Sequence, residues 1–251
     1  MKVFVGCCGW ALPMQKYFQK FSVIELQSTF YKIPKIKTVE KWKEKAPKDF
    51  IFTVKCYQGI THPISSPTWR RSGLKEEELK KLNEKVGFLK TTKETLEFWE
   101  KNSEICNILN SPVCLIQLPA NFKENEENIK NVEKFFSKVK KDNFSIALEL
   151  RGWSEKGFEN ICKKFDLISC VDPFALKPLH FSKKKIAYFR LHGKYERGKI
   201  DYKHKYKLKD LERLKEILTS LKLKEAFVLF NNFWMYENAV QLQNFLKDFK
   251  A

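Results

Sequence analysis

Apolar and polar residues alternate in a short stretch near the start of the chain. Val23, Glu25 and Gln27 fall on one side of an extended segment, while Ile24 and Leu26 fall on the other. This follows because side chains alternate between the two faces of a strand. A strand that carries a carboxylate near the end of one face must direct it toward water or another polar group. The pattern therefore predicts a strand whose last inward position, Glu25, is polar.

The same arrangement returns in five later segments, each of which ends in polar residues of one parity. The segments and their polar ends are Phe50–Lys55 with Lys55, Leu115–Pro119 with Gln117, Ser145–Arg151 with Glu149 and Arg151, Ile168–Asp172 with Asp172, and Tyr188–His192 with Arg190 and His192. In a parallel barrel, the carboxyl ends of all strands open on one face, where active sites form. The pattern predicts such a barrel, with these side chains at one mouth.

Eight predicted strands alternate with helical stretches along the chain. The helices are expected near residues 14–20, 38–46, 92–109, 125–139, 154–163, 208–221 and 236–249. This order favours an α/β fold of the TIM (β/α)8 type, formed by residues 1–251 as one domain. A doubly wound open sheet is the alternative, disfavoured because the first turn has no glycine-rich pattern. We also expect a long loop over residues 56–91, after the third strand, and a short or missing helix after the sixth.

The chain is strongly basic, with a formal net charge of +18. Of its 48 basic residues, 42 are Lys and six are Arg. Scattered Lys is more typical of a solvated surface than of phosphate or base recognition, for which Arg is better suited. The charge therefore predicts weak, nonspecific binding to nucleic acid, which falls steeply with salt.

Cysteine usage and hydropathy indicate a cytoplasmic protein. The seven cysteines are odd in number, show no C-x-x-C spacing and lie mostly in apolar runs, as buried reduced thiols do. The N-terminus does not have the pattern of a signal peptide, and no apolar run is long enough to span a membrane. We expect neither a zinc site nor a membrane partner.

Seven charged or titratable side chains at one mouth would cost desolvation energy unless they meet a ligand or each other. The catalytic candidates are Glu25, Glu149, His192 and Asp172, and the substrate-binding candidates are Lys55, Gln117, Arg151, Arg190 and Asn231. Two chemistries remain open. In the first, carboxylates and His192 would hold a divalent metal. In the second, basic groups would bind an anion while Glu25 or Glu149 acts as general acid or base. The sequence contains no nucleotide or flavin motif.

Arg190 stands two residues before the end of an apolar strand, where an unpaired guanidinium would be costly. We expect Glu25 and Glu149 to be its partners. The loop from His192 to Gly198 follows the seventh strand, where barrel enzymes commonly bind phosphate. Arg197 and the Gly193 backbone are the candidate anion-binding groups of that loop.

Seven short segments appear in order along nearly the whole chain: Gly6–Trp10, Glu25–Tyr31, Ile60–His62, Gln117–Pro119, Glu149–Arg151, Arg190–Gly193 and Phe230–Asn232. Together they resemble the DUF72 family, also called YecE-like or UPF0759, whose reaction is not established. The resemblance implies a TIM-type barrel, a cytoplasmic protein, and Tyr31 and His62 as further substrate-binding candidates. Two positions depart from the family pattern: Gln27 replaces the usual Asn, and Phe233 replaces a polar residue that could ligate a metal.

These features favour an enzyme, isomerase- or hydrolase-like, that acts on a small anionic substrate of phosphorylated or carbohydrate-like character. The alternative is an endonuclease IV-like nucleic-acid processing or nucleic-acid-binding protein that uses its Lys-rich surface. Convergent carboxylates disfavour simple nucleic-acid binding, because they would repel the phosphates.

Overall fold

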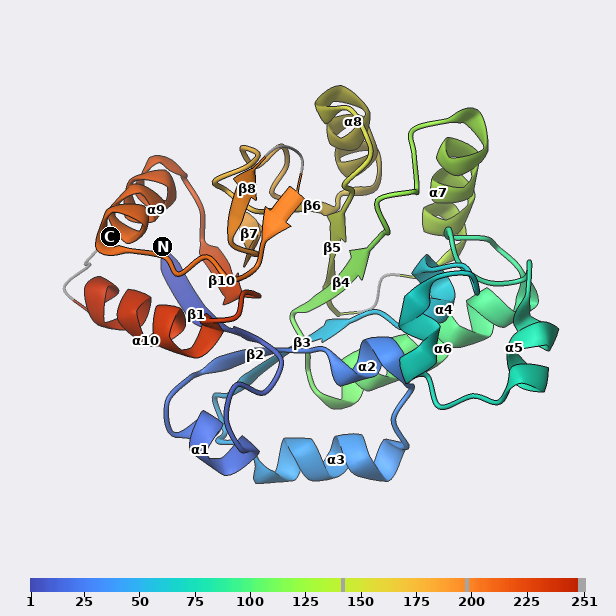
Figure 1. Ribbon diagram of the computed structural model, residues 1–251, viewed down its shortest axis with the longest axis horizontal. Helices are drawn as coiled ribbons and strands as arrows, with labels where there is room; N and C mark the ends of the chain where they lie inside the picture. The colour runs from blue at the N-terminus through green and yellow to red at the C-terminus, as the bar shows by residue number, and fades with distance from the viewer. Residues whose placement is uncertain (141–142, 197–198, 248–251) are drawn as a thin grey trace.

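Eight parallel strands close into a barrel in the order β1-β10-β7-β6-β5-β4-β3-β2 (Figure 1). The computed structural model describes residues 1–140, 143–196 and 199–247. The barrel strands are β1 (Lys2–Cys8), β2 (Val23–Leu26), β3 (Ile51–Lys55), β4 (Val113–Gln117), β5 (Ser145–Glu149), β6 (Ile168–Val171), β7 (Ile186–Leu191) and β10 (Glu225–Phe230). The expected TIM-type barrel is confirmed.

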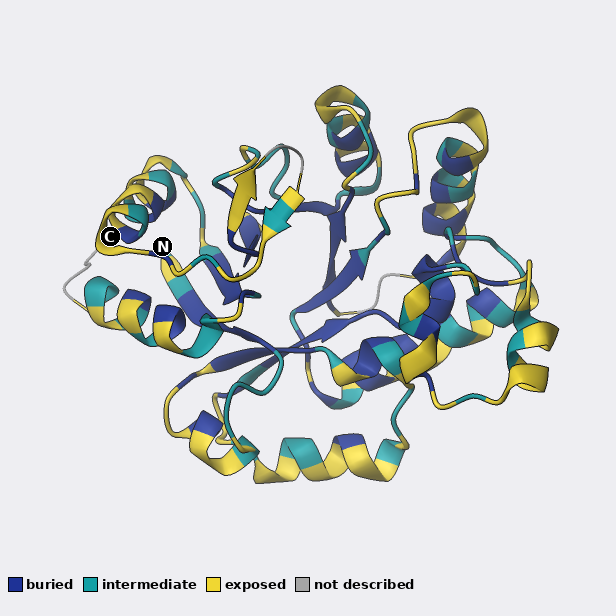
Figure 2. Ribbon diagram, in the orientation of Figure 1, coloured by how far each residue is buried: buried dark blue, intermediate teal, exposed yellow. Residues whose placement is uncertain are grey.

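Helices surround the barrel and bury only the face turned toward it (Figure 2). They are α1 (Met14–Phe18), α3 (Ile36–Lys45), α6 (Lys93–Ile108), α7 (Glu126–Lys138), α8 (Glu155–Phe165), α9 (Leu208–Ser220) and α10 (Met235–Leu246). Side-chain caps set several starts: Asn125 accepts a hydrogen bond from the Asn128 amide, and Ser154 accepts one from the Gly157 amide. The helix expected over 236–249 ends at Leu246, and residues 248 and 249 lie outside the described range.

The long segment after β3 is present and carries short helices of its own. They are α4 (Gln58–Thr61), the 3-10 helix η1 (Pro67–Arg71) and α5 (Glu76–Leu82), and a further short helix, α2 (Ser28–Tyr31), follows β2. Tyr57, Trp69 and Val86 form a small apolar cluster under this segment, which Figure 1 shows beside α6. After β6, residues 172–185 contain no helix. Both expected irregularities of the barrel are therefore confirmed.

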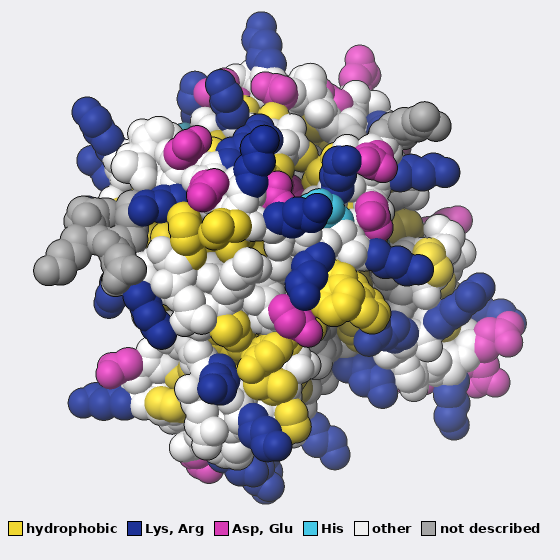
Figure 3. All heavy atoms as spheres, turned by 60° about the vertical axis from the view of Figure 1, so that its left-hand side comes forward, with side chains coloured by type: hydrophobic (Ala, Val, Ile, Leu, Met, Phe, Trp, Pro, Cys, Tyr) yellow, Lys and Arg dark blue, Asp and Glu magenta, His cyan; other side chains and the backbone are white. Residues whose placement is uncertain are grey.

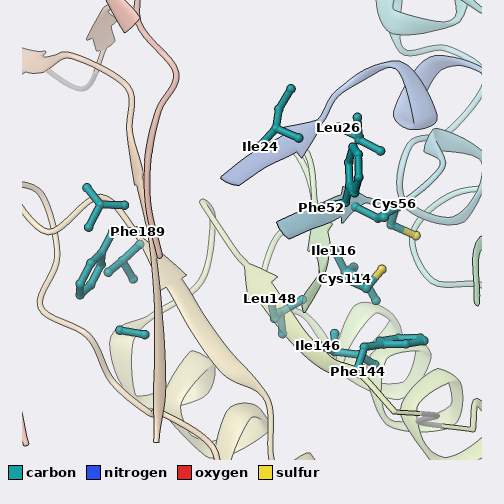
Figure 4. Packing of buried hydrophobic residues seen from close by; sticks show 14 of the residues in the cluster. Ile24, Leu26, Phe52, Cys56, Cys114, Ile116, Phe144, Ile146, Leu148 and Phe189 are labelled. Atoms are coloured by element: carbon teal, nitrogen blue, oxygen red, sulfur yellow. The ribbon is translucent and has the colours of Figure 1, made fainter. Parts of the chain in front are cut away.

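Side chains of opposite parity build two separate cores. Ile24, Leu26, Ile146 and Leu148 point outward and pack between the sheet and the helices (Figure 4). The opposite parity fills the barrel interior with a cluster of Phe4, Cys8, Val23, Val113, Leu115, Ala147, Ile168, Cys170, Ile186, Tyr188, Phe227 and Leu229. All seven cysteines are buried, as expected. The predicted strand parity is thus realised, and the polar strand ends lie on the interior side.

An antiparallel hairpin follows β7, where the sequence predicted only a loop. Its strands are β8 (Lys194–Glu196) and β9 (Lys199–Asp201), with Tyr195 opposite Ile200. Gly193 begins this turn with a φ of +117°, in the left-handed range, and a Cβ there would lie 2.1 Å from the Asp201 carbonyl oxygen. Only glycine fits such a position. Arg197 and Gly198 lie outside the described residues.

Candidate active site at the barrel mouth

The Arg190 side chain crosses the barrel interior and is 0% exposed. Its Nη1 donates to Glu149 Oε2 at 2.6 Å and to Gln117 Oε1 at 3.1 Å. Its Nη2 lies 3.0 Å from Glu25 Oε1. The two carboxylates expected to pair with Arg190 therefore do so, and the guanidinium joins β2, β4 and β5 from its place on β7. A buried cation with two anionic partners fixes the relative positions of these strand ends.

Glu25 is fully buried and receives further hydrogen bonds from neutral groups. The Tyr188 hydroxyl donates to Glu25 Oε2 at 2.8 Å and lies 2.7 Å from Thr53 Oγ1. The Gln27 side-chain amide donates to the other oxygen, Oε1. Gln27, which replaces the usual family Asn, thus reaches back to Glu25. The sequence analysis missed Tyr188, although it shares the parity of Arg190.

Glu149 is held as a carboxylate by two arginines. Arg151 Nε donates to its Oε1 at 2.6 Å, while Arg190 occupies Oε2. Burial alone would raise the pKa of Glu149, but the charges of Arg151 and Arg190 outweigh this effect and lower the pKa well below its usual value. The Arg151 side chain is 26% exposed, whereas that of Arg190 is 0% exposed. Of these two arginines, only Arg151 therefore reaches solvent.

His192 and Asp172 lie on the other side of the arginines. Nε2 of His192 is 2.8 Å from Arg151 Nη2 and 3.3 Å from Arg190 Nη1, so it accepts hydrogen bonds and the proton resides on Nδ1. Burial lowers the pKa of His192 to about 3. Asp172 accepts the backbone amides of His192 and Phe174, yet burial raises its pKa to about 6. Nδ1 of His192 lies 3.9 Å from Asp172 Oδ2 and is buried without a hydrogen-bond partner among the described residues.

Lys55, at the end of β3, belongs to the same mouth. Its side chain is 7% exposed and its Nζ lies 4.2 Å from the centre of the Phe30 ring. Burial lowers the pKa of Lys55 to about 8, and the charge of Arg190 acts in the same direction. Lys55 is thus an ammonium group that can lose its proton near neutral pH.

Tyr31 is the last residue of α2 and His62 directly follows α4, and both rings pack against Phe30, whose ring lies under the Lys55 amine. The Arg71 guanidinium stacks 3.7 Å above the Tyr31 ring, and the His62 ring packs edge-on against Phe30 with centroids 4.9 Å apart. Burial lowers the pKa of His62 to about 3, and the charge of Lys55 contributes. The segment after β3 therefore brings aromatic and basic groups to the rim.

Two predicted groups are not brought into the cluster, and a third lies outside the described residues. Asn231 donates its backbone amide to the Leu191 carbonyl, which extends the pairing of β10 with β7, and its side chain is half-buried. The Gly193 amide donates to the Tyr206 hydroxyl at 2.8 Å, so it is not available to an anion here. The expected contribution of the Gly193 backbone is therefore wrong for this conformation. Arg197 lies outside the described residues.

A pocket of about 640 Å³ opens beside the cluster. Its charged and titratable lining consists of Glu149, Arg151, Glu155, Asp172, His192 and Lys199, and its other walls include Trp153, Leu176, Tyr195 and Tyr202. The hairpin β8–β9 supplies Tyr195 and Lys199, which the sequence analysis did not select because it predicted a loop at this position. A charged floor under apolar walls is typical of small-molecule sites.

The residues of the mouth do not fit a divalent metal ion. Among the described residues, no three His, Cys, Asp or Glu side chains converge as such a site requires. Arg190 lies between Glu25 and Glu149 and uses oxygens of both, and the Nε2 of His192 accepts from arginine. Of the two chemistries left open by the sequence, the arrangement favours the one without a protein-held metal.

No helix in the described part of the chain has the length and apolar character needed to cross a membrane.

Comparison with known proteins assigns the chain to a family. The family model described as "Protein of unknown function DUF72" matches residues 4–250. The UPF0759 protein YunF of Bacillus subtilis is 23% identical, over 92% of this chain and 88% of YunF. A solved DUF72 family protein of Enterococcus faecalis V583 is 22% identical with a TM-score of 0.70, covering 98% of this chain and 97% of that one. A solved D-tagatose 3-epimerase-like protein shares the fold at 17% identity, with a TM-score of 0.59 and coverage of 99% and 96%. The chain belongs to the DUF72 family.

Proposed function

We propose that this protein is an enzyme that acts on a small anionic substrate, phosphorylated or carbohydrate-like, in the pocket at the barrel mouth. The observation that carries the proposal is the lining of the pocket: the partly exposed Arg151, the neutral imidazole of His192 and the carboxyl groups of Glu149, Glu155 and Asp172, together with aromatic and aliphatic walls. A purely structural ion-pair network does not need a pocket beside it. The epimerase-like name of one structural neighbour is consistent with a carbohydrate-like substrate.

Arg151 is the group we assign to the anion. Its guanidinium is partly exposed, borders the pocket, and is fixed by Glu149 at Nε and by His192 at Nη2. Arg190 is completely buried and occupied by two carboxylates, so it holds Glu149 in place beneath Arg151. The predicted roles of Arg151 and Arg190 in substrate binding are therefore divided between direct contact and positioning.

Asp172 is the residue that we assign to proton transfer. A group with a pKa of about 6 exchanges its proton readily near neutral pH, whereas Glu149 remains ionised. The neutral His192 beside it presents a buried Nδ1 proton with no partner among the described side chains, which suits donation to a substrate oxygen. Glu149 and Glu25 then provide fixed negative charge.

The test is calorimetric titration of phosphate, sulfate and sugar phosphates into the wild type and the Arg151→Gln variant. Loss of a hydrogen bond to a charged group is expected to weaken binding by roughly tenfold or more, from about 1.5–3 kcal/mol. Arg213→Gln is the matched control, because Arg213 is an exposed arginine on α9 that does not line the pocket. Equal affinities of the wild type and Arg151→Gln, or no binding of any anion to the wild type, would refute the proposal.

Nucleic-acid processing is the second candidate, and the net charge of +18 favours it. On the face seen in Figure 3, Lys and Arg are spread widely, with acidic side chains between them. Dispersed charge of this kind gives weak binding that is lost with salt. A complex with DNA or RNA that survives several hundred millimolar salt would promote this candidate over the first.

A further inference from the structure

Lys55 differs from the many surface lysines in how its charge is accommodated. Its side chain is almost entirely buried, and it forms no ion pair with a carboxylate among the described residues. The Nζ makes one long contact, 3.5 Å to Gln27 Oε1. A buried ammonium without an anionic partner is costly and favours its neutral amine form.

The missing ion pair follows from how the nearby carboxylates are used. Glu25 is engaged by Arg190, by the Tyr188 hydroxyl and by the Gln27 amide, while Glu149 is engaged by both mouth arginines. The same Gln27 therefore binds Glu25 through its amide nitrogen and contacts Lys55 through its oxygen. Because Arg190 pairs with both carboxylates, neither forms an ion pair with Lys55. The positive charge of Arg190 also disfavours the protonated form of Lys55.

Several charged and titratable groups surround the Lys55 amine. Arg190 opposes its protonation, Glu25, Glu149 and Cys8 support it, and burial dominates, which gives the pKa of about 8. The Lys55 amine lies over the Phe30 ring of α2, and the neutral His62 packs edge-on against the same ring. At pH 7 to 8 a substantial fraction of Lys55 is therefore a free amine, the form that attacks carbonyl carbon.

We infer that Lys55 is a nucleophile that forms an imine with a carbonyl-containing anionic substrate in the barrel mouth. The Lys55 ammonium first gives up one proton, and the nitrogen lone pair then forms a bond to the carbonyl carbon, which yields a carbinolamine. Protonation of its hydroxyl lets the C–O bond break and water leave. Ammonium and carbonyl are thus converted to an iminium ion and one water, with the single positive charge retained.

The surroundings of Lys55 suit each stage of this reaction. The Phe30 face, 4.2 Å from Nζ, stabilises a cation whether it is the ammonium or the iminium. Buried Glu25 and Glu149 supply negative charge without binding the nitrogen directly. The inference rests on the proposed function, because Arg151 must bind the anionic group of the substrate while its carbonyl group reaches past the pocket lining to Lys55 at the end of β3. It narrows the substrate class to anions that carry an aldehyde or ketone.

Reductive trapping of the full-length protein tests the inference. Pyruvate, glyoxylate and dihydroxyacetone phosphate are incubated separately with the protein, sodium borohydride is added, and the products are analysed by intact mass and peptide mapping. Hydride addition to the iminium leaves a secondary amine, with a mass gain equal to the carbonyl compound less one oxygen atom. We expect a single, saturable modification at Lys55, with a yield that rises as pH increases through about 8.

Two variants serve as controls. Lys55→Met should lose the modification, whereas Lys41→Met should keep it, because Lys41 is an exposed lysine on α3. Mapping and the pH profile of the wild type decide the question even if Lys55→Met fails to fold. Label at surface lysines without preference for Lys55, or a yield that rises only near pH 10, would overturn the inference. If calorimetry shows anion binding but borohydride traps no adduct, the imine is refuted and the proposed function stands. If neither anion binding nor trapping is observed, the proposed function is refuted as well.

Discussion

Replacement of Arg190 by methionine should destabilise the folded protein severely. The change keeps a long side chain but removes the one charge among the described residues that both Glu25 and Glu149 contact, at 3.0 and 2.6 Å. Breaking a buried ion pair from one side costs about 3–5 kcal/mol, because the remaining charge is buried without compensation. Arg151 still pairs with Glu149, and Tyr188 still donates to Glu25, so we expect the lower part of that range, about 3 kcal/mol.

The assay is urea unfolding at pH 7, followed by circular dichroism and extrapolated to water. A loss of about 3 kcal/mol is a large part of the 5–15 kcal/mol that keeps a typical domain folded, so a clear shift of the midpoint is expected. The triple variant Glu25→Gln, Arg190→Met, Glu149→Gln should recover much of the loss, since neutral groups replace Arg190 and both of its carboxylate partners. Arg213→Met, on the exposed surface of α9, is the control.

Unfolding at lower pH tests separately whether uncompensated carboxylate charge causes the loss of stability. In Arg190→Met, Glu149 loses one of the two charges that lower its pKa and takes up a proton more readily, so the deficit relative to the wild type should shrink as pH falls from 7 toward 4. A single variant that loses less than about 1 kcal/mol, the scale of an exposed ion pair, would refute the argument. A triple variant no more stable than the single one would refute it too, because uncompensated charge would not be the cause.

Two further outcomes are expected. Tyr188→Phe removes the hydroxyl that donates to Glu25 and leaves Thr53 without that partner, so urea unfolding should show a loss of about 1.5–3 kcal/mol, with Phe189→Leu as a volume control that keeps the network. Burial lowers the pKa of His62 from 6.5 to about 3, so the unfolded chain binds the extra proton between these values and the wild type loses stability as pH falls through that window. His62→Gln should lose less over the same window in thermal unfolding at pH 4, 5 and 6.5, and parallel curves would contradict this assignment.

The side chains of the mouth could be located from sequence because strand parity is a local property. Glu25, Glu149 and Arg190 each follow apolar residues of opposite facing, and a closed parallel barrel turns one parity of every strand inward. Their mutual pairing was also predictable, since a guanidinium at that depth needs anionic partners. The number of strands and the absence of a helix after β6 followed from spacing along the chain.

Short elements could not be predicted, because they contain too few residues for a periodic pattern. Helices of four residues, such as α4, complete barely one turn and show no hydrophobic period, and the hairpin β8–β9 is too short and exposed to produce a clear alternation. The pocket walls Tyr195 and Tyr202 depend on that hairpin. Tyr188 was missed because an aromatic residue inside an apolar strand is usually core, and only the fold shows its hydroxyl on Glu25.

The state of Lys55 depends on what its neighbours do with their charges. From sequence, three carboxylates and three cations at one mouth predict near neutrality, and each cation would be expected to find an anion. In the fold the ion pairs are distributed unequally. Arg190 contacts one oxygen of Glu25 and one of Glu149, and Arg151 contacts the second oxygen of Glu149, whereas Lys55 contacts no carboxylate oxygen among the described residues. A mouth that is balanced as a whole thus contains one ammonium held near its neutral form. This is the property that separates a reactive amine from a structural ion pair, and it arises from the geometry of the barrel rather than from the residue types alone.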